Sequence, residues 1–461
     1  MTGSPTSPWR QLVAALRRRL PWWPQPGRLQ PEENRSDQLD QEIAQFQQRL
    51  VEAAFSDDGG VGGIPFGKGG SETAYLAHPA RVLVRERDRA DLDAFFDERT
   101  EIYEGRGRTE DVVPGELVGY ELPTRRVDGG RDARATLDEI EEVLGRDVVM
   151  PDHIVYVTPQ GIGKLCPAGE PELPLGKGPV PALTDKSQAG DGILVSVVDT
   201  GWYRAGSRNP ETPWLRDRIL GDEETVDPED IHSYAGHGNF VGGVIRCLAP
   251  ATELDFEGVL TRAGAVYESV IARELNEALT SQNRPDLISV SAGCYTRNNA
   301  GLLAFTILME LFNLADGADA PLVVAAAGND ASDRPFFPAA YRWVTAVGAL
   351  EEDMSVAAFS NVGDWVDVYA HGSKLVNAFP TGTYFCKEPG PTQGEQRDFT
   401  GLAQWSGTSF ATPIVTGAVA AHMTESGETS PRAAVEALIA GGRPFTDSRV
   451  PQGVAVGPPF I

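Results

Sequence analysis

Residues 193–201 read ILVSVVDTG, an almost continuous apolar run that ends in an aspartate, a threonine and a glycine. Further apolar runs follow it, separated by stretches in which apolar residues recur with helical spacing. The runs are ELDFEGVL (253–260), DLISVSAG (286–293), PLVVAAAG (321–328) and WVTAVGAL (343–350), and the helical stretches include 266–281 and 302–315. Apolar strands that alternate with helices predict an α/β fold, in which a parallel sheet carries helices on both faces.

A smaller unit precedes this sheet. Strand patterns occur in RVLVRE (81–86), LVGYELP (117–123) and VVMPDHIVYVTP (148–159), with a short strand expected near residues 101–103, and helical patterns occur in 90–99 and 135–145. The order β-α-β-β-α-β predicts a ferredoxin-like α+β domain. The chain is therefore divided into a tail (1–70), this domain (71–162), a connector rich in proline and glycine (163–190) and the large α/β domain (191–461).

The tail has an unusual composition. Its first 28 residues contain five arginines, no acidic residue and three tryptophans. Such a basic segment can lie on a membrane surface or bind a partner, and a loosely ordered arm is the alternative interpretation. Residues 37–55 have helical spacing, and the glycine-rich residues 59–70 are expected to form a flexible linker.

Charge and cysteine content restrict the possible classes of protein. The formal net charge of −26 argues against nucleic-acid binding. Four widely spaced cysteines indicate neither a disulfide-dense scaffold nor a zinc site, so free thiols are expected, although one disulfide stays possible. We expect no metal and no cofactor. Without a long apolar run or an export signal, a cytoplasmic location is expected, and secretion by another route stays open.

Three residues supply the chemistry of a serine hydrolase. Asp199 ends an apolar strand, His237 follows a glycine at an expected helix start, and Ser409 lies near the start of another helix in GTSFATPIVTGAVAA (407–421). A serine nucleophile needs a base to take its proton and an anion to orient that base. The chain order Asp, His, Ser is one of three known orders for this triad.

A fourth residue completes the predicted site. Asn329 follows the strand 321–328, and its amide could donate a hydrogen bond to the oxyanion. The backbone N–H of Ser409, at a helix N-terminus, would be the second donor.

These residues lie in motifs that resemble those of the subtilase family. DTG, GHGNFVGG, AAAGN and GTSFATP occur in this order, and the resemblance extends over residues 193–440. It implies a serine endopeptidase that acts on polypeptide substrates. In that role Asp199 would orient His237, His237 would be the general base and acid, Ser409 the nucleophile and Asn329 the oxyanion donor.

The resemblance also implies how a substrate binds. An extended peptide would pair with the backbone of residues 261–266 and 291–293, and residues 325–328 would line the pocket before the scissile bond. The predicted substrate-binding residues are Gly264, Ser291, Ala292, Gly293, Ala327 and Gly328. Asp330 and Asp333 follow closely, so they could favour Arg or Lys in that pocket or could simply be solvated loop acids.

The ferredoxin-like unit resembles the inhibitory propeptide of the family, with cleavage expected between about Tyr156 and Lys164. Asn239 and Phe240 differ from the commonest family pattern, which suggests adjusted packing. GVIRCLAPATELDF (243–256) passes from the helix to the next strand with almost no insertion, which predicts that a calcium site found in many secreted subtilisins is absent. A catalytically latent or degraded subtilase that acts as a binding module is the alternative function.

Overall fold

The computed structural model describes most of the chain from residue 64 onward. The described residues are 64–66, 75–126, 129, 133–146, 148–157, 169–176, 178–207, 209–260, 264–387 and 392–458. Residues 1–63 of the predicted tail, which include the basic segment and the helix at 37–55, lie outside them, as does Cys166.

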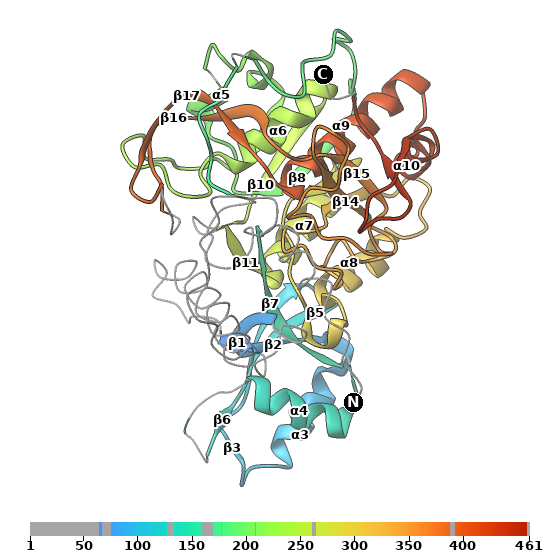
Figure 1. Ribbon diagram of the computed structural model, residues 1–461. Coiled ribbons are helices and arrows are strands. Elements are labelled where there is room, and N and C mark those ends of the chain that lie inside the picture. The colour runs from blue at the N-terminus through green and yellow to red at the C-terminus, as the bar shows by residue number, and fades with distance from the viewer. Residues whose placement is uncertain are drawn as a thin grey trace, which may run out of the picture.

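A nine-stranded sheet forms the centre of the large domain (Figure 1). Its strands lie in the order β18-β19-β15-β14-β13-β12-β8-β10-β9, and every pair is parallel except β18 with β19. The bounds are β8 (Leu194–Asp199), β9 (Ile219–Gly221), β10 (Glu253–Gly258), β12 (Leu287–Val290), β13 (Leu322–Ala326), β14 (Thr345–Leu350), β15 (Val368–His371), β18 (Arg443–Phe445) and β19 (Gly453–Ala455). The predicted α/β fold with a parallel sheet is confirmed.

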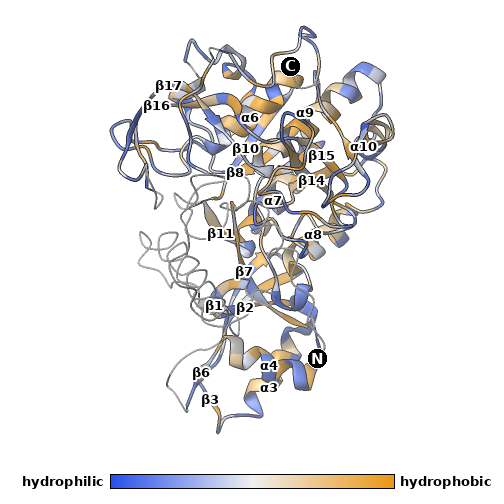
Figure 2. Cartoon of the chain, in the orientation of Figure 1, coloured by the Kyte–Doolittle hydropathy of each residue, from blue (hydrophilic) through white to orange (hydrophobic). Residues whose placement is uncertain are grey.

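Helices pack against both faces of this sheet. They are α6 (His237–Leu248), α7 (Glu268–Thr280), α8 (Leu303–Phe312), α9 (Thr408–Ser426) and α10 (Pro431–Ala440), whereas the short α5 (Arg204–Ser207) contacts β16 (Leu375–Phe385). The predicted helices at 266–281 and 302–315 correspond to α7 and α8. Figure 2 shows that apolar residues concentrate in α6, α9 and the central strands, as burial on both sides of the sheet requires.

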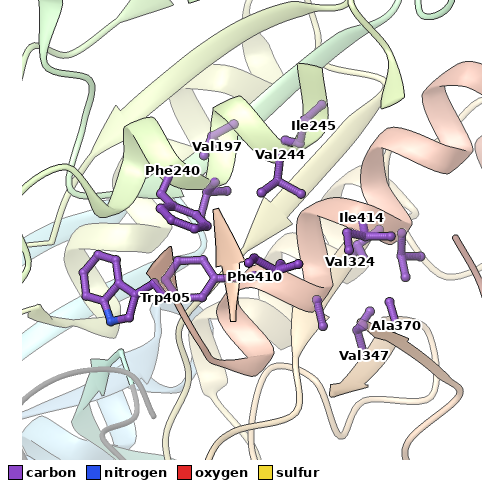
Figure 3. Close-up of a cluster of buried hydrophobic side chains, with 14 of the residues drawn as sticks. Val197, Phe240, Val244, Ile245, Val324, Val347, Ala370, Trp405, Phe410 and Ile414 are labelled. Carbon is purple, nitrogen blue, oxygen red and sulfur yellow. The ribbon is translucent and has the colours of Figure 1, made fainter. Parts of the chain in front are cut away.

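Alternate residues of one strand contribute to different cores. Val197 of β8 packs with Phe240 of α6 and Phe410 of α9, as Figure 3 shows, whereas its neighbour Val198 belongs to the core on the side of α7 and α8. Successive side chains of a strand point to opposite faces, so a strand covered on both faces must be apolar at consecutive positions. This explains the run in residues 193–198.

The N-terminal domain is an antiparallel sheet with two helices on one face. Strands β7, β2, β5 and β4 lie side by side in that order, and β1 also pairs with β2. The bounds are β1 (Ile64–Phe66), β2 (Tyr75–Arg85), α3 (Arg89–Asp97), β4 (Arg108–Val113), β5 (Leu117–Glu121), α4 (Ala133–Leu144) and β7 (Val149–Tyr156). The connectivity β-α-β-β-α-β is the one predicted.

Two details of the prediction for this domain are wrong. Residues 103–104 form β3 (Tyr103–Glu104), which pairs only with β6 (Thr124–Arg125), whereas the second strand of the unit is β4. The first four residues of β4 are exposed and polar, so this edge strand lacks an apolar pattern. In addition, the predicted linker at 59–70 contains β1.

The connector runs along a hairpin of the large domain. Glu172 pairs with Gln404 and Val180 with Val376, so the connector lies against β16 (Leu375–Phe385) and β17 (Gln396–Trp405). These two strands form a separate two-stranded sheet.

The N-terminal sheet packs its second face on the large domain. Leu83, Val113 and Met150 share a core with residues of α7 and α8. At this interface the buried Asp152 carboxylate accepts hydrogen bonds from Ser269 N and Ser269 Oγ, at 3.1 and 2.8 Å, and from Arg81 at 2.6 Å. Because Ser269 is in the first turn of α7, Asp152 satisfies a helix N–H that has no partner within the helix.

Removing this carboxylate should weaken the docking of the two domains. We expect Asp152→Ala to lower the free energy of unfolding of the full chain by about 3–5 kcal/mol, because Arg81 would keep a partly buried charge without its partner. Chemical unfolding measures the change.

Asp138→Ala is the matched control, because the Asp138 side chain is 69% exposed in its ion pair with Arg297 across the same interface. We expect a loss of at most about 1 kcal/mol there. Equal losses in the two variants would contradict the assigned role of Asp152.

Candidate active site

The structure brings three of the predicted residues to one edge of the large sheet. Asp199 is the last residue of β8, His237 is the first residue of α6, and Ser409 is the second residue of α9. Parallel strands end at the same edge of the sheet, and helices that follow them begin there. All three residues are buried, with 0, 0 and 1% exposure.

The aspartate holds one side of the imidazole. His237 Nδ1 lies 2.7 Å from Asp199 Oδ1, which also accepts the Thr200 N–H at 2.8 Å. A carboxylate accepts hydrogen bonds, so this contact requires the proton on Nδ1 and leaves Nε2 as the basic nitrogen of a neutral ring.

The serine hydroxyl does not bond to this ring in the structure. Ser409 Oγ donates to the Ser291 carbonyl oxygen at 3.1 Å, and Ser291 Oγ donates to the Ser409 carbonyl oxygen at 2.9 Å. Within the described ranges His237 Nε2 has no hydrogen-bond partner. Contacts of this kind are often long or misaligned before a substrate binds.

Aromatic side chains surround the imidazole. Its ring centroid lies 5.1 Å from that of Phe410 and 5.6 Å from that of Trp405, and Phe410 in turn packs on Phe240 at 4.4 Å. Phe240, one of the two departures from the family pattern, is therefore part of the packing that joins α6 to α9. This apolar surrounding excludes water and strengthens the electrostatic contact with Asp199.

The side chain of Asn329 is oriented by the residue before Ser409. Asn329 Oδ1 accepts Thr408 N at 2.9 Å and Thr408 Oγ1 at 2.8 Å. Because a backbone N–H can only donate, the acceptor must be the amide oxygen, which fixes the orientation of the amide. The NH2 group then lies on the side away from Thr408.

Asn361 shapes the same loop and was not found from the sequence. Its Oδ1 accepts the N–H groups of Asp330 and Ser332 at 3.0 and 2.9 Å, and its Nδ2 donates to the Ala327 carbonyl at 2.8 Å. These contacts span 29 to 34 residues in sequence, and one asparagine in a loop gives no signal of them. Gly328 also donates its N–H to Thr408 Oγ1, at 3.1 Å.

The two predicted substrate edges are paired with β7. Tyr156 N donates to Gly293 O at 2.9 Å, Gly293 N donates to Tyr156 O at 3.0 Å, and Val157 N donates to Gly264 O at 2.9 Å. Residues 154–156 also pair antiparallel with β11 (Ala265–Tyr267). The end of β7 thus lies between these edges, and Figure 1 shows it beside β11. Residues 261–263 of the predicted edge lie outside the described ranges.

The remaining predicted site residues are buried around the same edge. Ser291, Ala292, Ala327 and Gly328 are all buried. The Asp330 carboxylate accepts the Tyr295 hydroxyl at 2.9 Å, and the Asp333 carbonyl accepts Trp365 Nε1 at 3.1 Å. Selectivity for Arg or Lys through these two acids stays a prediction.

Other chemistry-bearing groups lie apart from this arrangement. Cys247, Cys294 and Cys386 are free and buried, and burial raises the pKa of each thiol. Among the described residues no group of three or more His, Cys, Asp or Glu could hold a metal ion. None of the helices in these described residues is long and apolar enough to cross a membrane.

Comparisons with known proteins identify the family of this chain. A sequence model described as the subtilase family matches residues 190–442. An intracellular serine protease of Paenibacillus polymyxa is 30% identical over 259 residues, covering 52% of this chain and 69% of that protein. Thermitase of Thermoactinomyces vulgaris is 29% identical over 260 residues, covering 54% and 81% respectively.

Among solved structures, a cold adapted subtilisin-like serine proteinase has a TM-score of 0.43 and 21% identity, covering 58% of this chain and 89% of its own. The family match alone spans more than half of the 461 residues. The chain therefore belongs to the subtilase family of serine peptidases.

Proposed function

We propose that this chain is a serine endopeptidase in which Ser409 is the nucleophile, His237 the general base and acid, and Asp199 the residue that orients His237. The observation that carries the proposal is the 2.7 Å contact between His237 Nδ1 and Asp199 Oδ1, which leaves Nε2 without a hydrogen-bond partner among the described residues. A base of this kind can take the proton of a serine hydroxyl.

The reaction would begin when the Ser409 hydroxyl turns from the Ser291 carbonyl toward His237 Nε2. His237 takes the hydroxyl proton while Oγ attacks the carbonyl carbon of the scissile peptide bond. The imidazolium that forms is stabilised by Asp199. It then returns the proton to the leaving amine, and a water molecule hydrolyses the acyl-enzyme by the same steps.

The negative oxygen of the tetrahedral intermediate needs hydrogen-bond donors. We infer that the Asn329 NH2 group and the Ser409 backbone N–H supply them. The contacts of Asn329 Oδ1 with Thr408 support this role, because they orient the amide before any substrate binds.

The N-terminal domain is proposed to inhibit the enzyme by occupying the substrate edges. The support is the backbone pairing of Tyr156 and Val157 with Gly293 and Gly264, which is the pairing expected of an extended peptide substrate. Cleavage within the expected interval, Tyr156 to Lys164, would separate this segment from the large domain.

A latent binding protein is the competing function. It would need no aligned base, whereas here Asp199, His237, Ser409 and Asn329 all lie at one sheet edge. Reactivity of the serine distinguishes the two functions.

Ser409→Ala should abolish labelling by a fluorophosphonate, because the reagent needs the activated hydroxyl. Intact-mass spectrometry of the labelled chain provides the measurement. Ser406→Ala is the control, since Ser406 lies in the same segment and its hydroxyl accepts the Lys374 N–H. Loss of labelling in both variants, or labelling that survives Ser409→Ala, would contradict the assignment.

Asn329→Ala should lower kcat by about 10²–10³-fold with little change in KM, a magnitude that was measured for the same kind of donor in a subtilisin. Steady-state kinetics on a peptide substrate test this. Thermal unfolding is the control, because Thr408 also loses its acceptor. A normal kcat in a folded variant would remove Asn329 from the proposed site.

Tyr156→Pro should weaken the inhibitory contact, because proline has no N–H to donate to Gly293 O. The initial rate of fluorophosphonate labelling of the full chain should rise above that of wild type. Tyr156→Phe keeps the backbone N–H and should behave like wild type.

If fully active enzyme contained only full-length chain by mass spectrometry, the proposed cleavage would be wrong.

A further inference from the structure

The first turn of α6 is attached to the segment that follows Asp199. Gly238 N donates to Thr200 Oγ1 at 3.2 Å. Asn239 Oδ1 accepts Tyr203 N at 2.6 Å, and Asn239 Nδ2 donates to Tyr203 O at 3.1 Å. Asn239, the second departure from the family pattern, therefore joins two backbone segments. These hydrogen bonds hold Gly238 and Asn239, which follow His237 in the helix. They do not involve Gly236, the residue before His237.

Gly236 has no side chain that could hold its own backbone in place. It has a φ of 72°, in the left-handed region that favours glycine, and a Cβ there would lie 2.2 Å from Pro380 Cδ. The position therefore requires glycine, which offers no side chain to cap the helix and has the largest backbone freedom of any residue.

A buried carboxylate from another loop provides the restraint. Glu224 Oε2 accepts the Gly236 N–H at 2.9 Å, and the Glu224 side chain is 6% exposed. Glu224 N also donates to Trp202 O at 2.9 Å, so its own loop is attached to the Asp199 segment. The carboxylate thus connects the residue before His237 to the strand end that carries Asp199.

The Glu224 carboxyl is buried close to two titratable groups, Asp199 and His232. Its Oε1 has no hydrogen-bond partner among the described residues and lies 3.6 Å from His232 Nε2. Burial raises the pKa of Glu224 well above its ordinary value, and the negative charge of Asp199 acts in the same direction. Burial disfavours the charged form of this carboxyl, and leaving a buried oxygen without a hydrogen-bond partner costs free energy.

We propose that Glu224 is a positioning residue for His237, which holds Gly236 and thereby the imidazole against Asp199 through the hydrogen bond to the Gly236 N–H. This proposal rests on the proposed function, since it assigns a role in aligning the base of that site. The titratable groups that face Glu224 are Asp199 at the end of β8 and His232 in the loop before α6.

The test compares Glu224→Ala and Glu224→Gln with Asp286→Ala in the full chain. Asp286 is a matched control, because its Oδ2 likewise accepts one backbone N–H, that of Leu194 at the opposite end of β8, at 2.9 Å. Kinetics on a peptide substrate as a function of pH give kcat, KM and the acid limb of kcat/KM. The low-field proton NMR signal of the His237–Asp199 hydrogen bond provides a second readout that needs no turnover.

Glu224→Ala should lower kcat about 10- to 100-fold with KM within about twofold of wild type, as expected when a reacting group is misplaced. It should also move the acid limb to lower pH, because a weaker contact with Asp199 stabilises the imidazolium less, and it should shift or broaden the low-field signal. Glu224→Gln can still accept the Gly236 N–H. It should keep kcat within about threefold and leave the acid limb in place, since the hydrogen bond that holds Gly236 is retained.

Two results would overturn the proposal. One is a Glu224→Ala chain with wild-type kcat, acid limb and low-field signal. The other is a loss of activity without any movement of the acid limb or the signal, as in Asp286→Ala, which would indicate only a structural role. Wild-type enzyme that shows no turnover even after cleavage between Tyr156 and Lys164 would count against the proposed function, while the NMR comparison on the full chain would still decide the role of Glu224.

Discussion

The contact between His237 and Asp199 depends on the parallel pairing of β8 with its two neighbours. β10 pairs with β8 as far as Asp199 and β12 pairs with residues 195–198, so the end of β8 has a fixed position in the interior of the sheet. Helix α6 begins at the same edge and packs on α9 through Phe240 and Phe410. One close-packed core therefore sets the distance between the residues that start both helices. Close packing resists small displacements, which a site of this kind requires.

Hydrogen bonds from loops orient the site residues that the core places at this edge of the sheet. The first turn of α6 is held by Thr200, Asn239 and Glu224, and the loop after β13 is held by Asn361 and by the contacts between Asn329 and Thr408. Each contact satisfies a buried backbone group, and leaving such a group unpaired would cost about 1–3 kcal/mol. The same bonds that make the buried edge stable also orient the groups that the proposed chemistry uses.

The N-terminal domain contacts the large domain through a shared core and through its last strand. One face of its sheet is covered by α3 and α4, and the other shares a core with α7 and α8. Its last strand, β7, then continues between β11 and Gly293. An extended strand can pair with exposed edges through its backbone alone, so the same edges suit both an internal segment and a peptide substrate of variable sequence. Docking of the domain and occupation of the edges are thus coupled through β7.

The sequence by itself determined the α/β fold, the central parallel strands β8, β10, β12, β13 and β14 with helices α7 and α8, and the four residues proposed for the chemistry. Apolar runs indicate strands that are buried on both faces. The motifs at strand ends and helix starts consist of neighbouring residues, so they can be recognised in the sequence. The strand β4 escaped prediction because its exposed edge has no apolar pattern. Only the tertiary structure decided that Glu224 holds Gly236, that Asn361 shapes the loop after β13, and that Ser409 Oγ rests on Ser291 O. These contacts join residues that are distant in the chain, and single polar residues in loops carry no periodicity that could reveal their partners.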